Sequence, residues 1–247
     1  MTSRFENKTI IITGAGSGIG LAAAKQAIAE GAKVVAVDLS AERLDAAAAE
    51  IGPAYVPVAI DITAADAPDK ILAAAGGTVD VLVNNAGIMD GFLPAAEVDD
   101  KTWDLILGVN LTAPFKLIRA VLPGMIEAGK GTIVNVSSEA SLRPCSGVAY
   151  AVSKRGINAL TQHVAALYRG KGIRCNAVVP GAVQTNVDGA FRSAYAPQVL
   201  GPLLQAGATA PAAPEELAAA ILFLADDAAA SNVNGVILPC DGGWSAV

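Results

Sequence analysis

Short apolar runs rich in valine and isoleucine alternate with alanine-rich stretches along nearly the whole chain. Most of the runs are continuously apolar, which is typical of parallel strands that are covered on both faces. We therefore expect strands at TIIIT (9–13), KVVAVD (33–38), AYVPVAI (54–60), VDVLVN (79–84), TIVNVS (132–137), IRCNAVV (173–179) and GVILP (235–239).

Helix patterns fill the spaces between these runs. Examples are GLAAAKQAIAEG (20–31) and SAERLDAAAAEIG (40–52), the second of which places Ser40 as an N-cap. Alternating strands and helices predict an α/β fold, with a doubly wound parallel sheet of about seven strands and helices on both faces. No linker, repeat or low-complexity tract divides the chain, so we expect a single domain over residues 1–247.

The segment 186–214 interrupts this alternation. It contains several glycine and proline residues and follows the sixth expected strand. Long insertions in compact domains often act as active-site lids or binding loops, although some are passive surface excursions. We expect 186–214 to be a substrate lid.

Composition narrows the class of protein. The chain has 247 residues and a net charge of −6, and an acidic chain does not suit a nucleic-acid surface. The start, MTSRFENKTIIITG, carries polar residues where a signal peptide needs an apolar core, and LAAAILFLA (217–225) is too short to span a bilayer. We expect a cytoplasmic protein without a membrane or nucleic-acid partner. Three cysteines without C-x-x-C spacing and a single histidine give no reason to expect a metal site.

A glycine-rich loop directly follows the first expected strand. TGAGSGIG (13–20) fits the spacing T-G-x-x-x-G-x-G through Gly14, Gly18 and Gly20, and a helix pattern comes next. Glycines let the backbone turn tightly and approach a pyrophosphate, whose charge the helix N-terminus stabilises. A strand, a glycine loop and a helix in this order predict a Rossmann-type dinucleotide site.

Asp38, which ends the second expected strand, indicates which dinucleotide is bound. A carboxylate at this place accepts hydrogen bonds from the hydroxyls of an adenosine ribose and repels a 2′-phosphate. No arginine or lysine stands in the glycine loop, or after Asp38 until Arg43. We therefore expect NAD in preference to NADP. The alternative role for Asp38, a helix N-cap, is already filled by Ser40.

The stretch YAVSK (150–154) places a phenol and an amine four residues apart, on the same face of a helix. Alone, this spacing favours a packed tyrosine beside a lysine that extends to water. Other motifs accompany it in order along the chain: NNAG (84–87), Asn110 in GVNLTAPF, SS (137–138) and PGAVQT (180–185). Together with the glycine loop, this series resembles the short-chain dehydrogenase/reductase family, of its compact single-domain type, over essentially the whole chain.

The resemblance implies an oxidoreductase that transfers a hydride between a secondary alcohol, or its ketone, and nicotinamide. In that family Tyr150 would be the general acid/base, and Lys154 would lower its pKa and hold the nicotinamide ribose. Ser138 would hold and polarise the substrate oxygen, and Asn110 would hold a water beside Lys154. The loop between Ser138 and Tyr150 is one residue shorter than in many relatives, so Ser137 stays open as the alternative serine.

The resemblance also implies a set of cofactor contacts along the carboxyl ends of the strands. Asp61 is the least specific of them, because the sequence DIT also offers a helix cap. The expected cofactor-binding residues are Gly14, Ser17, Gly18, Ile19, Gly20, Asp38, Asp61, Ile62, Asn85, Ala86, Gly87, Tyr150, Lys154, Pro180, Gly181, Val183 and Thr185.

The substrate pocket is expected to be formed by 88–95, 139–147 and 186–200, which are mainly apolar. A small apolar alcohol or ketone is therefore favoured over a charged metabolite. Two alternatives remain open: an enzyme like the 3-oxoacyl carrier-protein reductases, and a non-catalytic NAD(H)-binding redox sensor. Relatives are usually homotetramers and sometimes homodimers, so we expect one of these assemblies.

Overall fold

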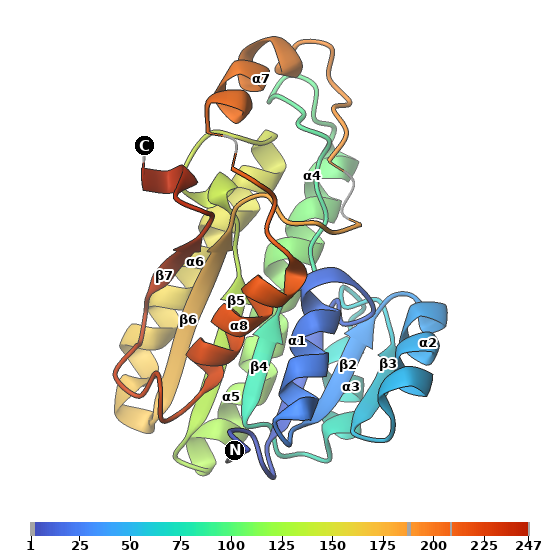
Figure 1. Cartoon of the computed structure of the whole chain (residues 1–247), viewed down its shortest axis with the longest axis vertical. Helices are drawn as coiled ribbons and strands as arrows, with labels where there is room; N and C mark the ends of the chain where they lie inside the picture. The colour runs from blue at the N-terminus through green and yellow to red at the C-terminus, as the bar shows by residue number, and fades with distance from the viewer. Residues whose placement is uncertain (1–2, 187–188, 208, 247) are drawn as a thin grey trace.

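Seven parallel strands form one sheet in the computed structural model, which describes residues 3–186, 189–207 and 209–246. The strands are β1 (Thr9–Thr13), β2 (Lys33–Asp38), β3 (Tyr55–Ala59), β4 (Val81–Asn84), β5 (Gly131–Val136), β6 (Ile173–Pro180) and β7 (Ile237–Cys240). Their order across the sheet is β3-β2-β1-β4-β5-β6-β7 (Figure 1). The strand order reverses between β1 and β4, and ligands of such sheets bind at the carboxyl ends of the strands beside this point.

Helices cover both faces of the sheet (Figure 1). One face carries α1, α2 and α8, and the other carries α3, α5 and α6. The α-helices are α1 (Gly18–Ala29), α2 (Ala41–Ile51), α3 (Ala67–Ala75), α4 (Asp100–Leu107), α5 (Ala113–Glu127), α6 (Val148–Tyr168), α7 (Ala196–Ala206) and α8 (Pro214–Ala225). The shorter turns are the π-helix η1 (Gly108–Thr112) and the 3-10 helices η2 (Glu139–Ser141), η3 (Arg169–Lys171) and η4 (Trp244–Ala246).

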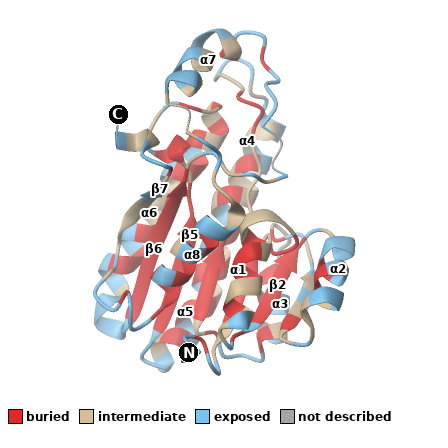
Figure 2. Cartoon of the chain, in the orientation of Figure 1, coloured by how far each residue is buried: buried red, intermediate tan, exposed pale blue. Residues whose placement is uncertain are grey.

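Because helices cover both faces of the sheet, most strands are continuous apolar runs in the sequence. In β1, Ile10 and Ile12 face the core beneath α1 and α8, whereas Ile11 faces the core beneath α3 and α5. Side chains alternate between the faces of a strand, so both sets must be apolar here. Figure 2 shows the resulting pattern of buried strands and exposed outer helix faces. The predicted α/β fold is confirmed.

The predicted strand boundaries hold at β1 and β2 and shift by one or two residues elsewhere. β7 begins at Ile237, two residues later than predicted, because Gly235 adopts a φ of +83°, which is not a strand conformation. β4 begins at Val81, after Asp80 has turned its side chain to accept a hydrogen bond from the backbone N–H of Thr9. Ser40 is the N-cap of α2 as predicted, and its side chain accepts a hydrogen bond from the N–H of Arg43.

The expected lid, 186–214, lies beyond the carboxyl edge of the sheet. It contains α7, which Figure 1 shows standing clear of the other helices, and most of α7 is exposed (Figure 2). An isolated bridge between Val183 and Ala212 brings the two ends of the segment together. Residues 187–188 and 208 of the expected lid lie outside the described residues.

The helical run Asp100–Glu127, formed by α4, η1 and α5, is long and apolar enough to span a membrane by length and composition. Core helices of globular proteins pass the same test. In this structure the run supplies Leu117, Ile118 and Val121 to the core beneath the sheet.

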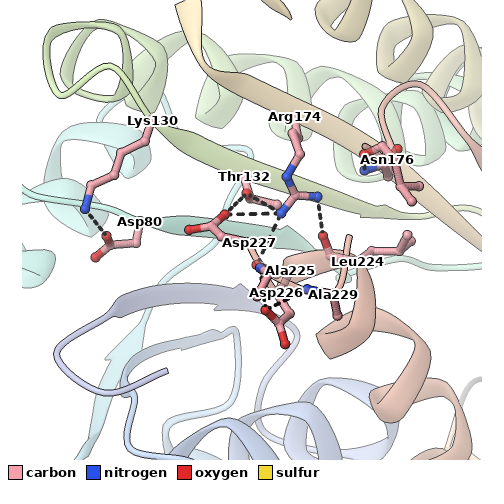
Figure 3. Close-up of polar contacts among 12 residues, drawn as sticks. Asp80, Lys130, Thr132, Arg174, Asn176, Leu224, Ala225, Asp226, Asp227 and Ala229 are labelled. Carbon is pink, nitrogen blue, oxygen red and sulfur yellow. Dashed lines mark hydrogen bonds and ion pairs between the residues drawn. The ribbon is translucent and has the colours of Figure 1, made fainter. Parts of the chain in front are cut away.

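Opposite the expected lid, the amino edge of the sheet carries a polar cluster around Arg174 (Figure 3). Its guanidinium donates to the carbonyl oxygen of Leu224 (2.8 Å) and to the hydroxyl of Thr132 (3.0 Å), and it pairs with Asp227 (3.2 Å). The arginine thus supplies a hydrogen-bond donor to a carbonyl group in the last turn of α8, which helices leave without a partner. The same contacts connect this end of α8 to β5 and β6. This edge therefore contributes stability and lies away from the expected site.

Candidate functional site

The glycine loop adopts backbone conformations and close contacts that leave no room for a Cβ atom. Gly14 and Gly18 adopt φ values of +67° and +53°, which residues with a Cβ rarely adopt. A Cβ on Gly20 would lie 2.2 Å from the carbonyl oxygen of Gly14. Ser17 is the N-cap of α1, and Ile19 lies in its first turn. The loop thus presents bare backbone at a helix N-terminus, which suits a pyrophosphate.

The NNAG loop after β4 is bound to the end of β1. The Oγ1 atom of Thr13 accepts hydrogen bonds from the backbone N–H groups of Asn85 and Ala86, each at 3.0 Å. The side-chain amide of Asn85 donates to the carbonyl oxygens of Thr13 (2.9 Å) and Gly14 (3.3 Å). The sequence prediction omits Thr13, whose only signal was its place between a strand and the first glycine.

Asp38 turns its carboxylate from the end of β2 toward the glycine loop. Its Oδ2 accepts a hydrogen bond from the backbone N–H of Gly16 (3.1 Å). Its Oδ1 accepts one from the N–H of Ser40 (2.9 Å) and pairs with the guanidinium of Arg43 (2.7 Å). Burial works to raise the pKa of Asp38, but the hydrogen bonds from Arg43, Ser40 and Gly16 hold this pKa below its usual value. An ionised carboxylate therefore stands where a ribose is expected.

Asp61 and Ile62 follow β3 at the same edge of the sheet. The Oδ1 atom of Asp61 accepts hydrogen bonds from the hydroxyl (2.7 Å) and the backbone N–H (2.8 Å) of Thr63, and these bonds lower its pKa. Helix α3 begins only at Ala67, so Asp61 closes a local turn and does not cap that helix. Ile62 is buried in the core on the α3 side, where its side chain serves packing.

Asn110 lies in the π-helix η1, where it is 1% exposed. Its Oδ1 accepts a hydrogen bond from the N–H of Ile88 (2.9 Å), and its Nδ2 donates to the carbonyl oxygen of Ile88 (2.9 Å) and to Oγ of Ser153 (3.1 Å). Asparagine is unfavourable inside a helix, and single π turns often occur at functional sites. Asn110 thereby joins η1 to α6 and to Ile88, the residue directly after the NNAG loop.

Lys154 is a buried amine, 4% exposed, on α6. Its Nζ donates a hydrogen bond to the carbonyl oxygen of Val136 at 2.9 Å. Burial lowers its pKa to about 8. A Cβ on Gly87 would lie 3.3 Å from Nζ, so the amine faces the NNAG loop.

Tyr150 stands one helical turn before Lys154, whose Nζ lies 5.6 Å from the centroid of the phenol ring. Burial raises the pKa of Tyr150, a hydrogen bond with Ser138 works against that rise, and the charge of Asp90 adds to it. In the protein alone the phenol is therefore held protonated at neutral pH.

The two serines at the end of β5 have different surroundings. Ser137 is buried, and its Oγ donates to the backbone carbonyl of Lys154 at 3.2 Å. Ser138 is hydrogen bonded to Tyr150, and its Oγ also accepts from the N–H of Ala140 at 3.2 Å. The geometry brings Ser138, and not Ser137, to the phenol.

The remaining expected contacts follow β6. Pro180 ends that strand, and Val183 forms the isolated bridge with Ala212 at the base of the expected lid. A Cβ on Gly181 would lie 3.0 Å from backbone and side-chain atoms of the C-terminal segment. The methyl group of Thr185 would lie 3.1 Å from a Cβ on Gly18, so the segment that follows β6 approaches the phosphate side of the glycine loop.

These residues all meet at the carboxyl edge of the sheet, and their chemistry fits a nicotinamide dinucleotide. Glycine backbone is available for the phosphates, a carboxylate for a ribose, and an amine and a phenol for the reacting end. Among the described residues, no group of three or more His, Cys, Asp or Glu side chains is placed to hold a metal ion.

One contact at this edge is not predicted from the sequence. Asp90, in the otherwise apolar loop IMDGFLPA (88–95), is buried against the N-terminus of α6, where Gly147 is the N-cap. A charged residue within an apolar loop was the available signal. Its partner is distant in the sequence, so no local pattern identifies it.

Known proteins are similar to this chain in both sequence and fold. Residues 8–196 match the family model for short chain dehydrogenases. The chain is 38% identical to the short chain dehydrogenase ausX of Penicillium brasilianum, over 98% of each chain. It is 39% identical to 3beta-hydroxysteroid dehydrogenase 2 of Eggerthella lenta, over 97% of this chain and 95% of the other.

Two solved structures are also similar. Levodione reductase superposes with a TM-score of 0.88 at 31% identity, over 98% of this chain and 99% of the other. A protein of Beutenbergia cavernae assigned as an NAD(P)-dependent gluconate 5-dehydrogenase, with NADP bound at low occupancy, superposes with a TM-score of 0.85 at 34% identity over all of both chains. With the glycine loop and the Tyr150–Lys154 pair in place, the chain belongs to the short-chain dehydrogenase/reductase family of nicotinamide-dependent oxidoreductases.

Proposed function

We propose that this enzyme transfers a hydride between a secondary alcohol, or its ketone, and NAD, with Tyr150 as the general acid/base. The observation that carries the proposal is the meeting of Ser138, Tyr150 and Lys154 at the edge where the glycine loop opens. The phenol is hydrogen bonded to the serine, and the buried amine lies 5.6 Å from the centroid of its ring.

The chemistry follows from these neighbours. In alcohol oxidation the Tyr150 phenolate accepts the hydroxyl proton as the C–H bond releases its hydride, and ketone reduction is the reverse. The hydroxyl of Ser138 donates a hydrogen bond to the same substrate oxygen. When bound, oxidised nicotinamide supplies the hydride acceptor and a positive charge that favours the phenolate. The buried Lys154 ammonium acts in the same direction, which counters the rise in the pKa of Tyr150 that burial causes.

The choice of NAD rests on Asp38. Its ionised carboxylate is oriented by two backbone N–H groups, so it accepts hydrogen bonds from ribose hydroxyls without reorganisation. A 2′-phosphate would meet this negative charge. Arg43 is the group that would favour NADP, and it is paired with Asp38 in this structure.

An apolar alicyclic or aromatic substrate suits the surroundings of the phenol. Phe191 in the expected lid packs against Phe92 with ring centroids 4.3 Å apart, and the neighbouring Leu93 accepts a hydrogen bond from the N–H of Val148 in the first turn of α6. The names of two relatives, a hydroxysteroid dehydrogenase and levodione reductase, point to substrates of the same class.

The test is NADH formation from NAD and a panel of secondary alcohols of aromatic, alicyclic, steroid, sugar and hydroxyacyl types. We expect turnover of an apolar class. The variant Tyr150→Phe should reduce kcat by at least about 100-fold while NADH still binds, because only the proton-transferring hydroxyl is lost. Equal activity in the variant would contradict the mechanism. NADH binding without turnover of any alcohol would instead favour the redox-sensor alternative.

A further inference from the structure

We propose that Asp90 is a positioning residue for Tyr150, because its buried carboxylate caps α6 in the place of an N-cap side chain and fixes the first turn that carries the phenol. This inference rests on the proposed function, since it concerns the placement of the proposed acid/base. The role assigned to Asp90 acts through the first turn of α6.

The first observation is a cap supplied from another part of the chain. The N-cap of α6 is Gly147, which has no side chain to accept the free N–H groups of the first turn. The Oδ2 atom of Asp90 accepts a hydrogen bond from the backbone N–H of Tyr150 at 3.0 Å. Tyr150 is the third residue of the helix, and an N-cap side chain ordinarily binds the N–H of the second or third residue.

The second observation is that the carboxylate occupies the space of the missing side chain. A Cβ on Gly147 would lie 2.1 Å from Oδ1 of Asp90. Gly147 has φ −70° and ψ 163°, which any residue adopts, so glycine is required here by the contact and not by the backbone. Asp90 is 1% exposed, and the partial positive charge of the helix N-terminus stabilises its buried charge.

The loop that carries Asp90 is itself held on two sides. Oδ1 of Asp90 accepts a hydrogen bond from the N–H of Phe92 (3.1 Å), and the carbonyl oxygen of Leu93 accepts one from the N–H of Val148 (3.0 Å). On the lid side, the N–H of Arg192 donates to the carbonyl oxygen of Gly91 (2.9 Å). The segment 90–93 therefore joins the first turn of the catalytic helix to the lid.

Asp90 also contributes to the electrostatic surroundings of the phenol. Tyr150 is faced by Ser138, Cys145 and Asp90, and by the Lys154 ammonium one turn along α6. The negative charge of Asp90 is one of the causes that raise the pKa of Tyr150. Its removal should therefore lower the pKa of the phenol.

The decisive experiment moves the cap from Asp90 to the ordinary N-cap position. Asp90→Ala should lower kcat by about 10- to 100-fold, because small displacements of a catalytic group have effects of this size. The dissociation constant for NADH should stay within about twofold. In the double variant Asp90→Ala/Gly147→Ser, a serine has room to cap the helix, and kcat should return most of the way to that of the wild type.

Amide hydrogen exchange of the peptide covering 147–153 gives a second readout that needs no turnover. Exchange should be faster in Asp90→Ala and slower again in the double variant. If the wild type oxidises no alcohol, the proposed function fails while exchange still decides the role of Asp90. The inference is overturned if Asp90→Ala keeps both wild-type kcat and wild-type exchange, or if the double variant restores neither.

Two single variants separate charge from placement. Asp90→Asn keeps the shape and one acceptor oxygen, so kcat should fall less than in Asp90→Ala. The acidic limb of its pH profile for oxidation should move to lower pH, whereas a purely structural role would leave the limb in place. Gly147→Ala should resemble Asp90→Ala because its Cβ displaces the carboxylate. Gly170→Ala is its control, since a Cβ there meets nothing within 4 Å, and wild-type rates for Gly147→Ala would contradict the inference.

Discussion

The guanidinium of Arg43 lies 2.7 Å from Oδ1 of Asp38, where β2 ends and α2 begins. The pair places a carboxylate that suits a ribose directly beside a cation that suits a 2′-phosphate. As long as Asp38 is ionised, Arg43 is engaged by it. Removal of the carboxylate should therefore release the cation and change which dinucleotide is bound.

Cofactor preference tests this relationship. We expect the wild type to bind NADH more tightly than NADPH, and Asp38→Ser to shift the ratio of the two dissociation constants toward NADPH by about 100-fold or more. Fluorescence titration with each reduced cofactor measures both constants. The control is Asp38→Ser/Arg43→Ala, which should lose the gain for NADPH. A wild type that prefers NADPH would show that Arg43, and not Asp38, sets the specificity.

We expect alanine substitutions of the two serines at the end of β5 to have different effects on kcat and on stability. Ser138→Ala removes the hydroxyl that is bonded to Tyr150, and we expect kcat to fall by about 100-fold with little change in stability. Ser137→Ala removes a buried hydrogen bond to the carbonyl of Lys154, and we expect a loss of about 1 kcal/mol in unfolding free energy and a smaller loss of kcat. Steady-state rates and urea unfolding measure the two effects. The reverse order of kcat losses would assign the substrate oxygen to Ser137.

The buried amine of Lys154 should make stability depend on pH. Its pKa is about 8 in the folded protein and near 10.5 when unfolded, so between these values the unfolded state binds more protons. Stability from this group should therefore rise as the pH increases from 8 to 10.5. Below pH 8 the full cost of burying the charge is present, about 3 kcal/mol from the size of the shift.

Lys154→Met removes that cost, and urea unfolding of the cofactor-free protein provides the measurement. We expect the variant to be inactive but more stable than the wild type at pH 7, with a smaller difference at pH 9.5. Lys101→Met, at an exposed position of α4, is the control and should show no such trend. A Lys154→Met variant that is less stable than the wild type at pH 7 would contradict the cost of burial.

Arg174 should affect stability without affecting catalysis. Arg174→Met leaves the carbonyl of Leu224 and the hydroxyl of Thr132 without their donor, and we expect a loss of about 2–3 kcal/mol in unfolding free energy. The kcat of the folded variant should equal that of the wild type, because the cluster lies at the opposite edge of the sheet from Tyr150. Lys70→Met, which removes an exposed pair with Asp66, is the control and should leave the unfolding midpoint unchanged. A change in kcat for Arg174→Met would reveal coupling between the two edges.

The sequence predicts those parts of the fold and the site that depend on local patterns. The apolar runs locate β1 and β2 to the residue, and the glycine spacing locates the loop whose conformation excludes a Cβ at Gly20. Contacts between distant segments are not predicted. Thr13 at the end of β1 binds the NNAG loop after the neighbouring strand β4, and Asp90 caps a helix that begins far along the chain. The choice between Ser137 and Ser138 likewise depended on side-chain direction, which no spacing specifies.

The polar cluster around Arg174 lies at the amino ends of β5 and β6 (Figure 3), whereas Ser138 and the amine of Lys154 lie at the carboxyl end of β5. Between them the strands bury apolar cores on both faces, together with hydrogen bonds that join Asn84, Asn135 and Thr161. We expect stability and catalysis to respond to substitutions at opposite ends of these strands. Substitutions at the amino edge should change the free energy of unfolding, whereas exchanges in the expected lid, 186–214, should change which substrates the enzyme accepts.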